Sequence, residues 1–279
     1  FRVEFLFSKG IGMIFFPMLQ YKKQGVEAEI ITPVRVEQLP ATFVSGLMLL
    51  CYFRATESKD VIIFSGTMGD YVQLRREYML KSLRKMDVLP NPFEQFDIWF
   101  KEAVNAKLPD PNAITLATST FEGRPSARVV LMKHYDSDGI AFFTNYESRK
   151  ARNLLKNPYA AMVFFWPELE RQVRIEGKVS RVSEQQSDRY FQTRPEGSKI
   201  GAWASPQSSV IPNRRYLEQL HADFMEEFQG TTIKRPPNWG GYILQPALFE
   251  FWQGRENRLH DRIQYSLVNE KWLIERLAP

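Results

Sequence analysis

The chain has 279 residues, of which 44% are hydrophobic and 25% are charged, and its formal net charge is +5, a composition ordinary for a globular protein. It has no long basic run, which argues against nucleic-acid binding, and its apolar residues 41–53 are too few to cross a membrane. The single cysteine, Cys51, excludes a disulfide within the chain and indicates a reducing, cytoplasmic setting. With three histidines and no Cys/His set at zinc spacing, no metal site is expected.

The composition changes near residue 67. Residues 1–67 contain scattered apolar pieces with no helical or strand period. We therefore expect an atypical N-terminal extension that is poorly ordered or not native, with Met68 as a candidate start. The alternative is a genuine additional subdomain. Regular patterns begin beyond Met68, so residues 68–279 are expected to form the folded domain.

The elements expected in this domain are short strands with few helices between them. Residues 68–87 are expected to form a short helix or a flexible arm, and residues 92–106 a helix with an apolar stripe of Phe93, Phe96, Phe100 and Val104. Strands are predicted at 113–119, 127–133, 140–144, 160–165, 172–182, 241–245, 248–253, 261–267 and 272–277, and further helices at 148–156, 183–193 and 214–228. This pattern argues against a doubly wound parallel sheet and favours an antiparallel barrel with peripheral helices.

A basic helix start follows the strand at 140–144. Ser148 is a candidate N-cap, and Arg149 and Lys150 then occupy the first turn, where the helix dipole disfavours positive charge. A bound anion would remove this conflict, because backbone N–H groups and both cations would converge on it. The alternative is a solvated basic turn.

Two cations bracket the apolar strand predicted at 127–133. Arg128 and Lys133 are separated by an odd number of residues, so a regular strand would point them to opposite faces. They would then serve two different anions. The alternative is that both side chains reach solvent from the ends of the strand.

Two further patterns combine cations with groups that bind anions. Tyr190 and Arg194 are four residues apart and share a helix face, Pro195 should end that helix, and Ser198 would follow in the turn, so the three side chains could clamp a phosphate. Arg258, His260 and Arg262 alternate, so a strand would place all three on one face.

Polar side chains near these sites suit a planar ligand. Gln172, Gln207 and Ser208 carry amides or a hydroxyl that could contact the edge of a heterocycle such as a flavin, although each is more often ordinary polar surface.

Together these segments resemble the pyridoxine 5′-phosphate oxidase family from about residue 74 to residue 279. The most specific matches are residues 128–133, 142–150, 171–177, 207–212, 251–262 and 275–279. The resemblance implies an FMN-binding split β-barrel and a homodimer with two FMN sites at the subunit interface. It therefore agrees with the strand-rich pattern.

The resemblance also implies a role for each site residue. Those expected to contact FMN are Arg128, Val129, Val130, Leu131, Phe143, Thr144, Arg149, Lys150, Gln172, Gln207, Ser208, Trp252 and Arg262. Those expected to hold the substrate are Lys133, Tyr190, Arg194 and Ser198 at its phosphate, Arg258, Leu259 and His260 over its ring, and Arg75 and Tyr78 in an N-terminal lid. Arg258 and His260 are the expected catalytic residues.

The reaction that this family implies is the oxidation of pyridoxine 5′-phosphate and pyridoxamine 5′-phosphate by O2. The product is pyridoxal 5′-phosphate, with hydrogen peroxide and, from the amine, ammonia. The flavin carries the redox chemistry, and the protein supplies orientation and electrostatics. Two alternatives remain: another split-barrel flavin reductase, or a non-catalytic protein that binds FMN or pyridoxal phosphate.

Overall fold

The computed structural model describes Tyr78 and residues 80–279, and Arg76–Pro279 form one compact unit. The predicted extension, residues 1–67, and the predicted lid residue Arg75 lie outside the described residues. The strands are β1 Ala113–Ser119, β2 Pro125–Leu131, β3 His134–Asp136, β4 Gly139–Asn145, β5 Tyr159–Trp166, β6 Arg171–Arg181, β7 Trp239–Gln253, β8 Asp261–Val268 and β9 Lys271–Leu277. The helices are α1 Pro92–Asn105, α2 Arg149–Lys156, α3 Glu184–Gln192, α4 Glu196–Ala204 and α5 Arg214–Glu227, with short 3-10 turns at Lys85–Asp87, Pro167–Leu169 and Glu256–Arg258.

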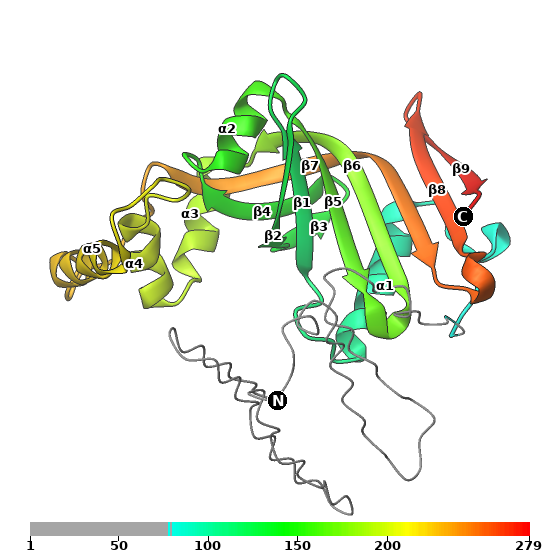
Figure 1. Cartoon of the computed structure of the whole chain (residues 1–279), viewed down its shortest axis with the longest axis horizontal. Coiled ribbons are helices and arrows are strands. Elements are labelled where there is room, and N and C mark those ends of the chain that lie inside the picture. Colours follow the sequence, from blue (N-terminus) through cyan, green and yellow to red (C-terminus); the bar gives the residue numbers. More distant parts are fainter. Residues whose placement is uncertain (1–77, 79) are drawn as a thin grey trace, which may run out of the picture. The chain divides into compact units, whose positions relative to one another are not determined.

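All the strands belong to one curled antiparallel sheet, with the helices at its periphery (Figure 1). The main order is β2-β1-β5-β6-β7-β4-β3, and the β8–β9 hairpin continues from β7. The predicted fold, a mainly β split barrel with peripheral helices, is confirmed. Within the described residues, no helix has both the length and the hydrophobicity needed to cross a bilayer.

β7 divides the sheet because its two halves pair with different strands. Residues from Trp239 to Leu244 pair with β4, whereas residues from Leu248 to Gln253 pair with β8. The prediction of two separate strands here was wrong. Pro246 lacks an N–H group, but it lies where the register between β6 and β7 shifts, so the strand continues through it. At this bulge a Cβ on Gly177 would lie 2.0 Å from the carbonyl oxygen of Gln245, so only glycine fits.

Helix α1 packs against the concave side of the sheet and closes the main core. Asn91 caps it by accepting a hydrogen bond from the Phe93 N–H, and Pro92 occupies its first turn. The predicted stripe is correct at Phe96, which is fully buried, but wrong at Val104, which is 47% exposed. Trp99 and Ala103, which are one turn apart on α1, are buried instead, because the helix face that carries them packs against the sheet.

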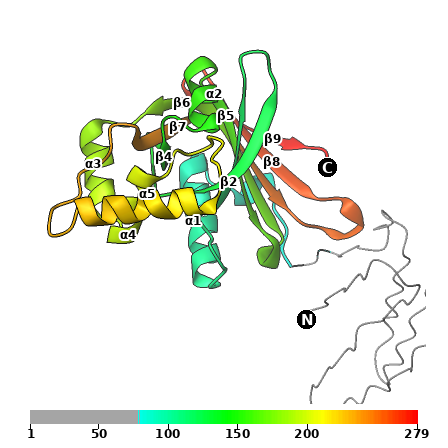
Figure 2. The same ribbon diagram turned by 60° about the vertical axis from the view of Figure 1, so that its left-hand side comes forward.

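The two ends of the unit carry different elements (Figure 2). Helices α3, α4 and α5 lie at one end, over a second small core that contains Phe191, Ile200 and Trp239. The β8–β9 hairpin lies at the other end, as both views show. Helix α4 was not predicted: Pro195 does end the preceding helix, but a new helix begins at once, so Ser198 lies in α4 and not in a turn.

The strand predicted at 127–133 ends early. β2 stops at Leu131, after which the backbone N–H groups of Met132 and Lys133 donate to Asn112 and to Ala141 of β4. The chain thus changes partner strand, and a short unpredicted strand, β3, follows. Because Lys133 lies outside the regular strand, the predicted alternation between Arg128 and Lys133 does not apply.

Candidate functional site

Three cations meet where β4 runs into α2, and we call Arg128, Arg149 and Lys150 the basic cluster. The predicted cap is confirmed: the Ser148 hydroxyl accepts from the Ala151 N–H at the start of α2. Lys150 is only 8% exposed. Its ammonium donates to Thr144 Oγ1 at 2.9 Å, Ser148 Oγ at 3.2 Å and Gln207 Oε1 at 2.9 Å.

Arg128 reaches the same place from β2. Its Nη1 donates to the Leu116 carbonyl at 3.1 Å and to Thr118 Oγ1 at 2.8 Å, and its Nη2 donates to Ser126 Oγ at 2.6 Å. These acceptors are all neutral. Thr118 and Ser126 were not singled out in the sequence, because single hydroxyls on strands carry no motif.

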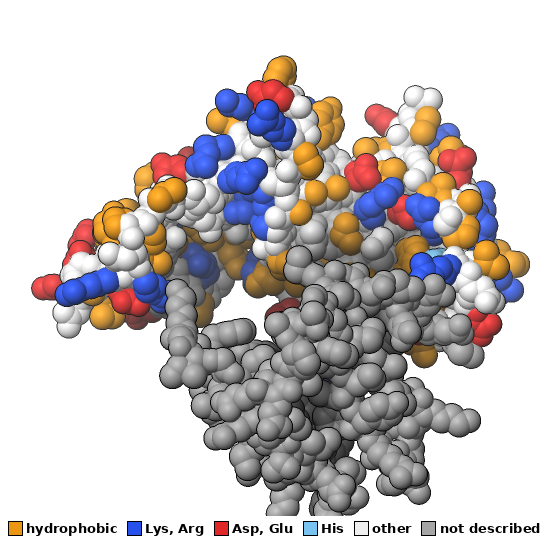
Figure 3. Space-filling model, viewed as in Figure 1, with side chains coloured by type: hydrophobic (Ala, Val, Ile, Leu, Met, Phe, Trp, Pro, Cys, Tyr) orange, Lys and Arg blue, Asp and Glu red, His pale blue; other side chains and the backbone are white. Residues whose placement is uncertain are grey.

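The basic cluster holds its positive charge without a carboxylate. No ion pair within Tyr78 and residues 80–279 includes any of its three members. Burial, and then repulsion from Arg128, lowers the pKa of Lys150 to about 8, and burial with repulsion from Arg149 lowers the pKa of Arg128. Figure 3 shows Lys and Arg side chains gathered on the face that carries α2. Such a cluster is suited to bind an anion.

A stack of aromatic rings stands beside this cluster, and we call Phe143, Tyr190 and Trp239 the aromatic wall. The ring centroids of Phe143 and Tyr190 are 4.0 Å apart, and those of Phe143 and Trp239 are 5.6 Å apart, with both pairs stacked. The Arg194 guanidinium lies 4.7 Å from the Trp239 ring centroid. Trp239 was not predicted to be part of the site. The Gly240-Gly241 pair that follows it was an available signal, because it lets β7 pack closely against Phe143: a Cβ on Gly241 would lie 2.7 Å from the Phe143 ring.

Arg194 has an unused donor. Its Nη1 atom is buried and has no hydrogen-bond partner within the described part of the chain. Burial lowers the pKa of Arg194 and raises the pKa of Tyr190. The electrostatic interaction between the two side chains partly offsets both shifts, since it raises the pKa of Arg194 and lowers that of Tyr190. A buried donor without an acceptor costs free energy, so this position is suited to receive an acceptor such as a phosphate oxygen.

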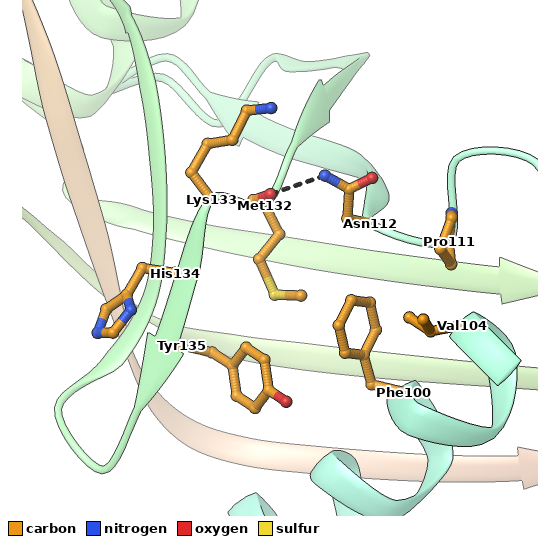
Figure 4. A pocket seen from close by; sticks show the side chains of 8 residues that line it. All are labelled: Phe100, Val104, Pro111, Asn112, Met132, Lys133, His134 and Tyr135. Carbon is orange, nitrogen blue, oxygen red and sulfur yellow. Dashed lines mark hydrogen bonds between the residues drawn. The ribbon is translucent and has the colours of Figure 1, made fainter. Parts of the chain in front are cut away.

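Lys133 and Ser198 are exposed and contact neither Arg194 nor the basic cluster through any hydrogen bond in the structure. Lys133 borders a cavity of about 400 Å³ between α1 and β3. Figure 4 shows Met132, Phe100 and Tyr135 converging on this cavity, while the Lys133 ammonium points away from it.

A third group lies at the far end of β7, and we call Tyr78, Trp252 and His260 the histidine group. The Trp252 and His260 ring centroids are 4.6 Å apart, and the Tyr78 ring lies edge-on to both at 5.6 and 5.8 Å. His260 Nδ1 accepts from the Arg255 N–H at 3.1 Å. Burial, followed by the charge of Arg258, lowers the pKa of His260.

The predicted alternation of Arg258, His260 and Arg262 on one strand is wrong. β8 begins only at Asp261, and Arg258 closes a 3-10 turn with a φ of 61°, after Asn257 with a φ of 53°. Left-handed backbone cannot continue a strand. Arg258 and the neighbouring Leu259 are exposed beside the histidine group, and only Arg262 belongs to β8.

The charge of Arg262 is compensated, unlike that of the basic cluster. Its Nε donates at 2.7 Å to Glu250, a carboxylate that is 2% exposed, and its Nη1 donates to the Ala278 carbonyl. Gln172 of β6 lies opposite Trp252 of β7, and Trp252 in turn lies opposite Arg262. These three residues therefore line adjacent strands at the end of the sheet that carries the histidine group.

The other predicted residues fall near the basic cluster. Val129, Val130 and Leu131 continue β2 beyond Arg128, with Val129 68% exposed. Gln207 contacts Lys150, and Ser208 follows it with a φ of 69°. The loop after α4 thus closes over the start of α2.

One chain does not bring all the predicted residues together. Trp239 of the aromatic wall and Trp252 of the histidine group lie near opposite ends of β7. A strand rises about 3.3 Å per residue, so roughly 40 Å of strand separates them. The basic cluster, the aromatic wall and Arg194 lie toward the β4 end of β7, and the histidine group with Gln172 and Arg262 lies at its β8 end. We call these two sets candidate half-sites.

Comparisons with known proteins identify the family of the chain. The family model described as pyridoxamine 5′-phosphate oxidase matches residues 100–222, and that described as the pyridoxine 5′-phosphate oxidase C-terminal dimerisation region matches residues 239–279. The chain is 55% identical over 206 residues to the pyridoxine/pyridoxamine 5′-phosphate oxidase of a Cyanothece species, covering 74% of this chain and 97% of that one. It is also 55% identical over 215 residues to the Burkholderia thailandensis enzyme of the same name, covering 76% and 100%.

Solved structures show the same fold. The chain superimposes on PhzG from Burkholderia lata, in complex with tetrahydrophenazine-1-carboxylic acid, with a TM-score of 0.68 at 30% identity, covering 72% of this chain and 99% of that one. A pyridoxamine 5′-phosphate oxidase-related, FMN-binding protein from Nostoc punctiforme shares the fold with a TM-score of 0.55 at 19% identity, covering 68% and 98%. By its family models and its relatives, the chain belongs to the pyridoxine/pyridoxamine 5′-phosphate oxidase family.

Proposed function

We propose that the protein is an FMN-dependent oxidase that converts pyridoxine 5′-phosphate and pyridoxamine 5′-phosphate to pyridoxal 5′-phosphate. When bound, FMN would supply the redox chemistry: the hydride from the C4′ carbon and the proton released with it would pass through the flavin to O2, which yields hydrogen peroxide. The single observation that carries the proposal is that the basic cluster and Arg194 are two separate cationic positions without a carboxylate partner among the described residues. A phosphorylated cofactor and a phosphorylated substrate together need two such positions.

The basic cluster fits the phosphate of FMN. Lys150, Arg128 and Arg149 bring positive charge to the N-terminal turn of α2, where free backbone N–H groups also favour an anion. An anion here would offset both the burial of Lys150 and its repulsion from Arg128. Thr144 and Gln207 hold the Lys150 ammonium in place.

Arg194 fits the phosphate of the substrate. Its buried Nη1 offers a donor that nothing in the described chain uses, and the aromatic wall fixes the plane of the guanidinium. We infer that Tyr190 and Ser198 complete this site and that Lys133 turns toward it when substrate is present. The ligand in the PhzG structure is named as a carboxylic acid, so use of a phosphate at this position would distinguish this chain from that relative.

We propose that the second half-site comes from another copy of the chain. The histidine group lies too far along β7 to meet the basic cluster of its own chain, and residues 239–279 match a dimerisation region. A homodimer would place Trp252, Arg262 and Gln172 against FMN, and Arg258 and His260 over the substrate ring. This arrangement yields two equivalent sites, as a twofold interface requires.

His260 is suited to donate a hydrogen bond to the substrate. Its Nδ1 accepts from a backbone N–H, and its lowered pKa favours the neutral ring, so the proton of the neutral ring is assigned to Nε2. Nε2 is then a donor and not a base. Arg258 adds a permanent positive charge that orients the substrate and stabilises charge developing during hydride transfer.

The experiment that tests the proposal is aerobic turnover of pyridoxamine 5′-phosphate by the FMN-loaded protein. We expect hydrogen peroxide and pyridoxal 5′-phosphate in equal amounts, with no turnover of pyridoxamine itself. Binding of FMN without peroxide would favour a carrier. Reduction of the flavin only by a nicotinamide would favour a flavin reductase.

A further inference from the structure

A buried amide stands behind Arg128. Asn153, on the second turn of α2, is 7% exposed. Its Nδ2 donates to Thr118 Oγ1 at 3.1 Å and to Ser126 Oγ at 3.2 Å. These two hydroxyls are the same ones that accept from the Arg128 guanidinium. Asn153, Thr118, Ser126 and Arg128 thus form one network that joins α2, β1 and β2.

The direction of the bonds from Arg128 and Asn153 follows from their chemistry. A guanidinium and an amide NH2 group can only donate, so each hydroxyl accepts once from Arg128 and once from Asn153. The two protons of Asn153 Nδ2 are used on the two hydroxyls, whose oxygens also lie 3.4 Å apart, with either able to donate to the other. The Ser126 hydroxyl can also donate to the Thr118 carbonyl at 3.4 Å. The hydroxyls therefore cannot rotate away without losing a bond.

The network contains no negative charge. Two other arginines are held by carboxylates: the buried Arg171 by Glu102, and the half-buried Arg262 by Glu250. Arg128 is held by neutral oxygens instead. The Arg128 guanidinium is thus held in one position while its positive charge stays available to an anion. The neutral amide of Asn153 allows both, whereas a carboxylate at position 153 would hold the guanidinium but neutralise its charge.

We propose that Asn153 is a positioning residue for the cofactor phosphate, acting through Thr118 and Ser126 on Arg128. This inference rests on the proposed function, in which the basic cluster binds the phosphate of FMN. Asn153 lies on the same helix as Arg149 and Lys150, so it also fixes the distance between Arg128 and the other two cations. The side-chain hydrogen bonds of Asn153 go to Thr118 and Ser126, so its effect should be confined to the phosphate.

The test compares the affinities of the apoprotein for FMN and for riboflavin, which lacks the phosphate. The ratio of the two dissociation constants measures the contribution of the phosphate alone. For Asn153→Ala we expect this preference for FMN to fall about tenfold, or about 1.4 kcal/mol, with riboflavin affinity unchanged. The matched control is Asn157→Ala, because Asn157 Nδ2 donates to Ser119 Oγ at 2.8 Å and anchors the end of α2 to β1 without contacting Arg128.

A second variant separates charge from geometry. Asn153→Asp keeps the shape of the side chain but places a carboxylate behind Arg128, so we expect it to reduce the preference for FMN at least as much as alanine does. Unchanged riboflavin affinity in each variant shows that the site is folded. A wild-type preference for FMN in either Asn153 variant, or an equal loss in Asn157→Ala, overturns the inference alone. A wild-type protein that binds riboflavin as tightly as FMN overturns the phosphate site itself, and the proposed function with it.

Discussion

The affinity for FMN should fall as pH rises through the pKa of Lys150. Burial and the charge of Arg128 lower this pKa to about 8 in the protein without its cofactor. The ammonium is then about 90% protonated at pH 7 and about 10% protonated at pH 9. A ligand that binds only the charged form loses affinity in proportion to that fraction. We therefore expect the dissociation constant for FMN to rise about tenfold between pH 7 and pH 9.

The assay is quenching of FMN fluorescence by the apoprotein across this range. The phosphate itself is already a dianion, because its second pKa is about 6. Riboflavin controls for any effect on the ring, and Lys150→Arg, which stays charged, should bind FMN equally at both pH values. A flat profile for the wild type, or the same tenfold loss in Lys150→Arg, would refute the reasoning.

The same shift has the opposite effect on the apoprotein. The pKa of Lys150 is lowered from 10.5 to about 8 on folding, so the unfolded chain binds more protons between these values. The contribution of Lys150 to stability therefore rises with pH across this window, while the affinity for FMN falls. Thermal unfolding of the apoprotein measures the first trend independently of the second.

Three further changes test other parts of the site. Arg194→Ala should raise the KM for pyridoxamine 5′-phosphate ten- to about a hundredfold, since a charge-assisted bond contributes about 1.5–3 kcal/mol, and should leave FMN affinity intact; Arg189→Ala, an exposed arginine on α3, is the control, and equal loss of flavin binding would reassign Arg194 to the cofactor. His260→Ala should lower kcat/KM about tenfold, roughly 1.4 kcal/mol, at unchanged FMN occupancy. Wild-type turnover should itself fall on the acid side of the ordinary histidine range, because burial and Arg258 lower the pKa of His260 and protonation removes the acceptor for the Arg255 N–H; the same acid fall in His260→Ala would contradict this role. Deletion of residues 1–67 should leave FMN binding and turnover unchanged, because Arg76–Pro279 form a compact unit, and loss of folded protein on truncation would show that the extension is structural.

Local signals in the sequence predicted most of the fold. Caps and breakers set the helix ends: Ser148 and Ser183 start α2 and α3, and Pro195 follows the end of α3. The errors came where tertiary pairing overrides local pattern. β7 runs through Pro246 because a bulge accommodates the missing N–H, and no sequence period shows which strand will lie opposite.

The site was predicted less completely than the fold. The local motif was identified correctly: Ser148 caps α2, and Arg149 and Lys150 follow it in the first turn, with Lys150 bonded to the Ser148 hydroxyl. Alternation failed at Arg258, because the left-handed turn before β8 has no glycine to signal it. Trp239, Thr118 and Ser126 contact residues that are distant in the sequence, such as Phe143 and Asn153. Only the three-dimensional structure identifies them as parts of the site.

The central claim is that one site for a phosphorylated substrate is built from two chains, and mixing two impaired variants at a substrate concentration below the KM tests it directly. Arg194→Ala and His260→Ala damage different half-sites. In a dimer that contains one copy of each, one site carries both lesions and the other carries neither. Random exchange of subunits should therefore restore peroxide formation from pyridoxamine 5′-phosphate to about a quarter of the wild-type rate. A mixture whose rate is only the average of its two parent variants would contradict the account.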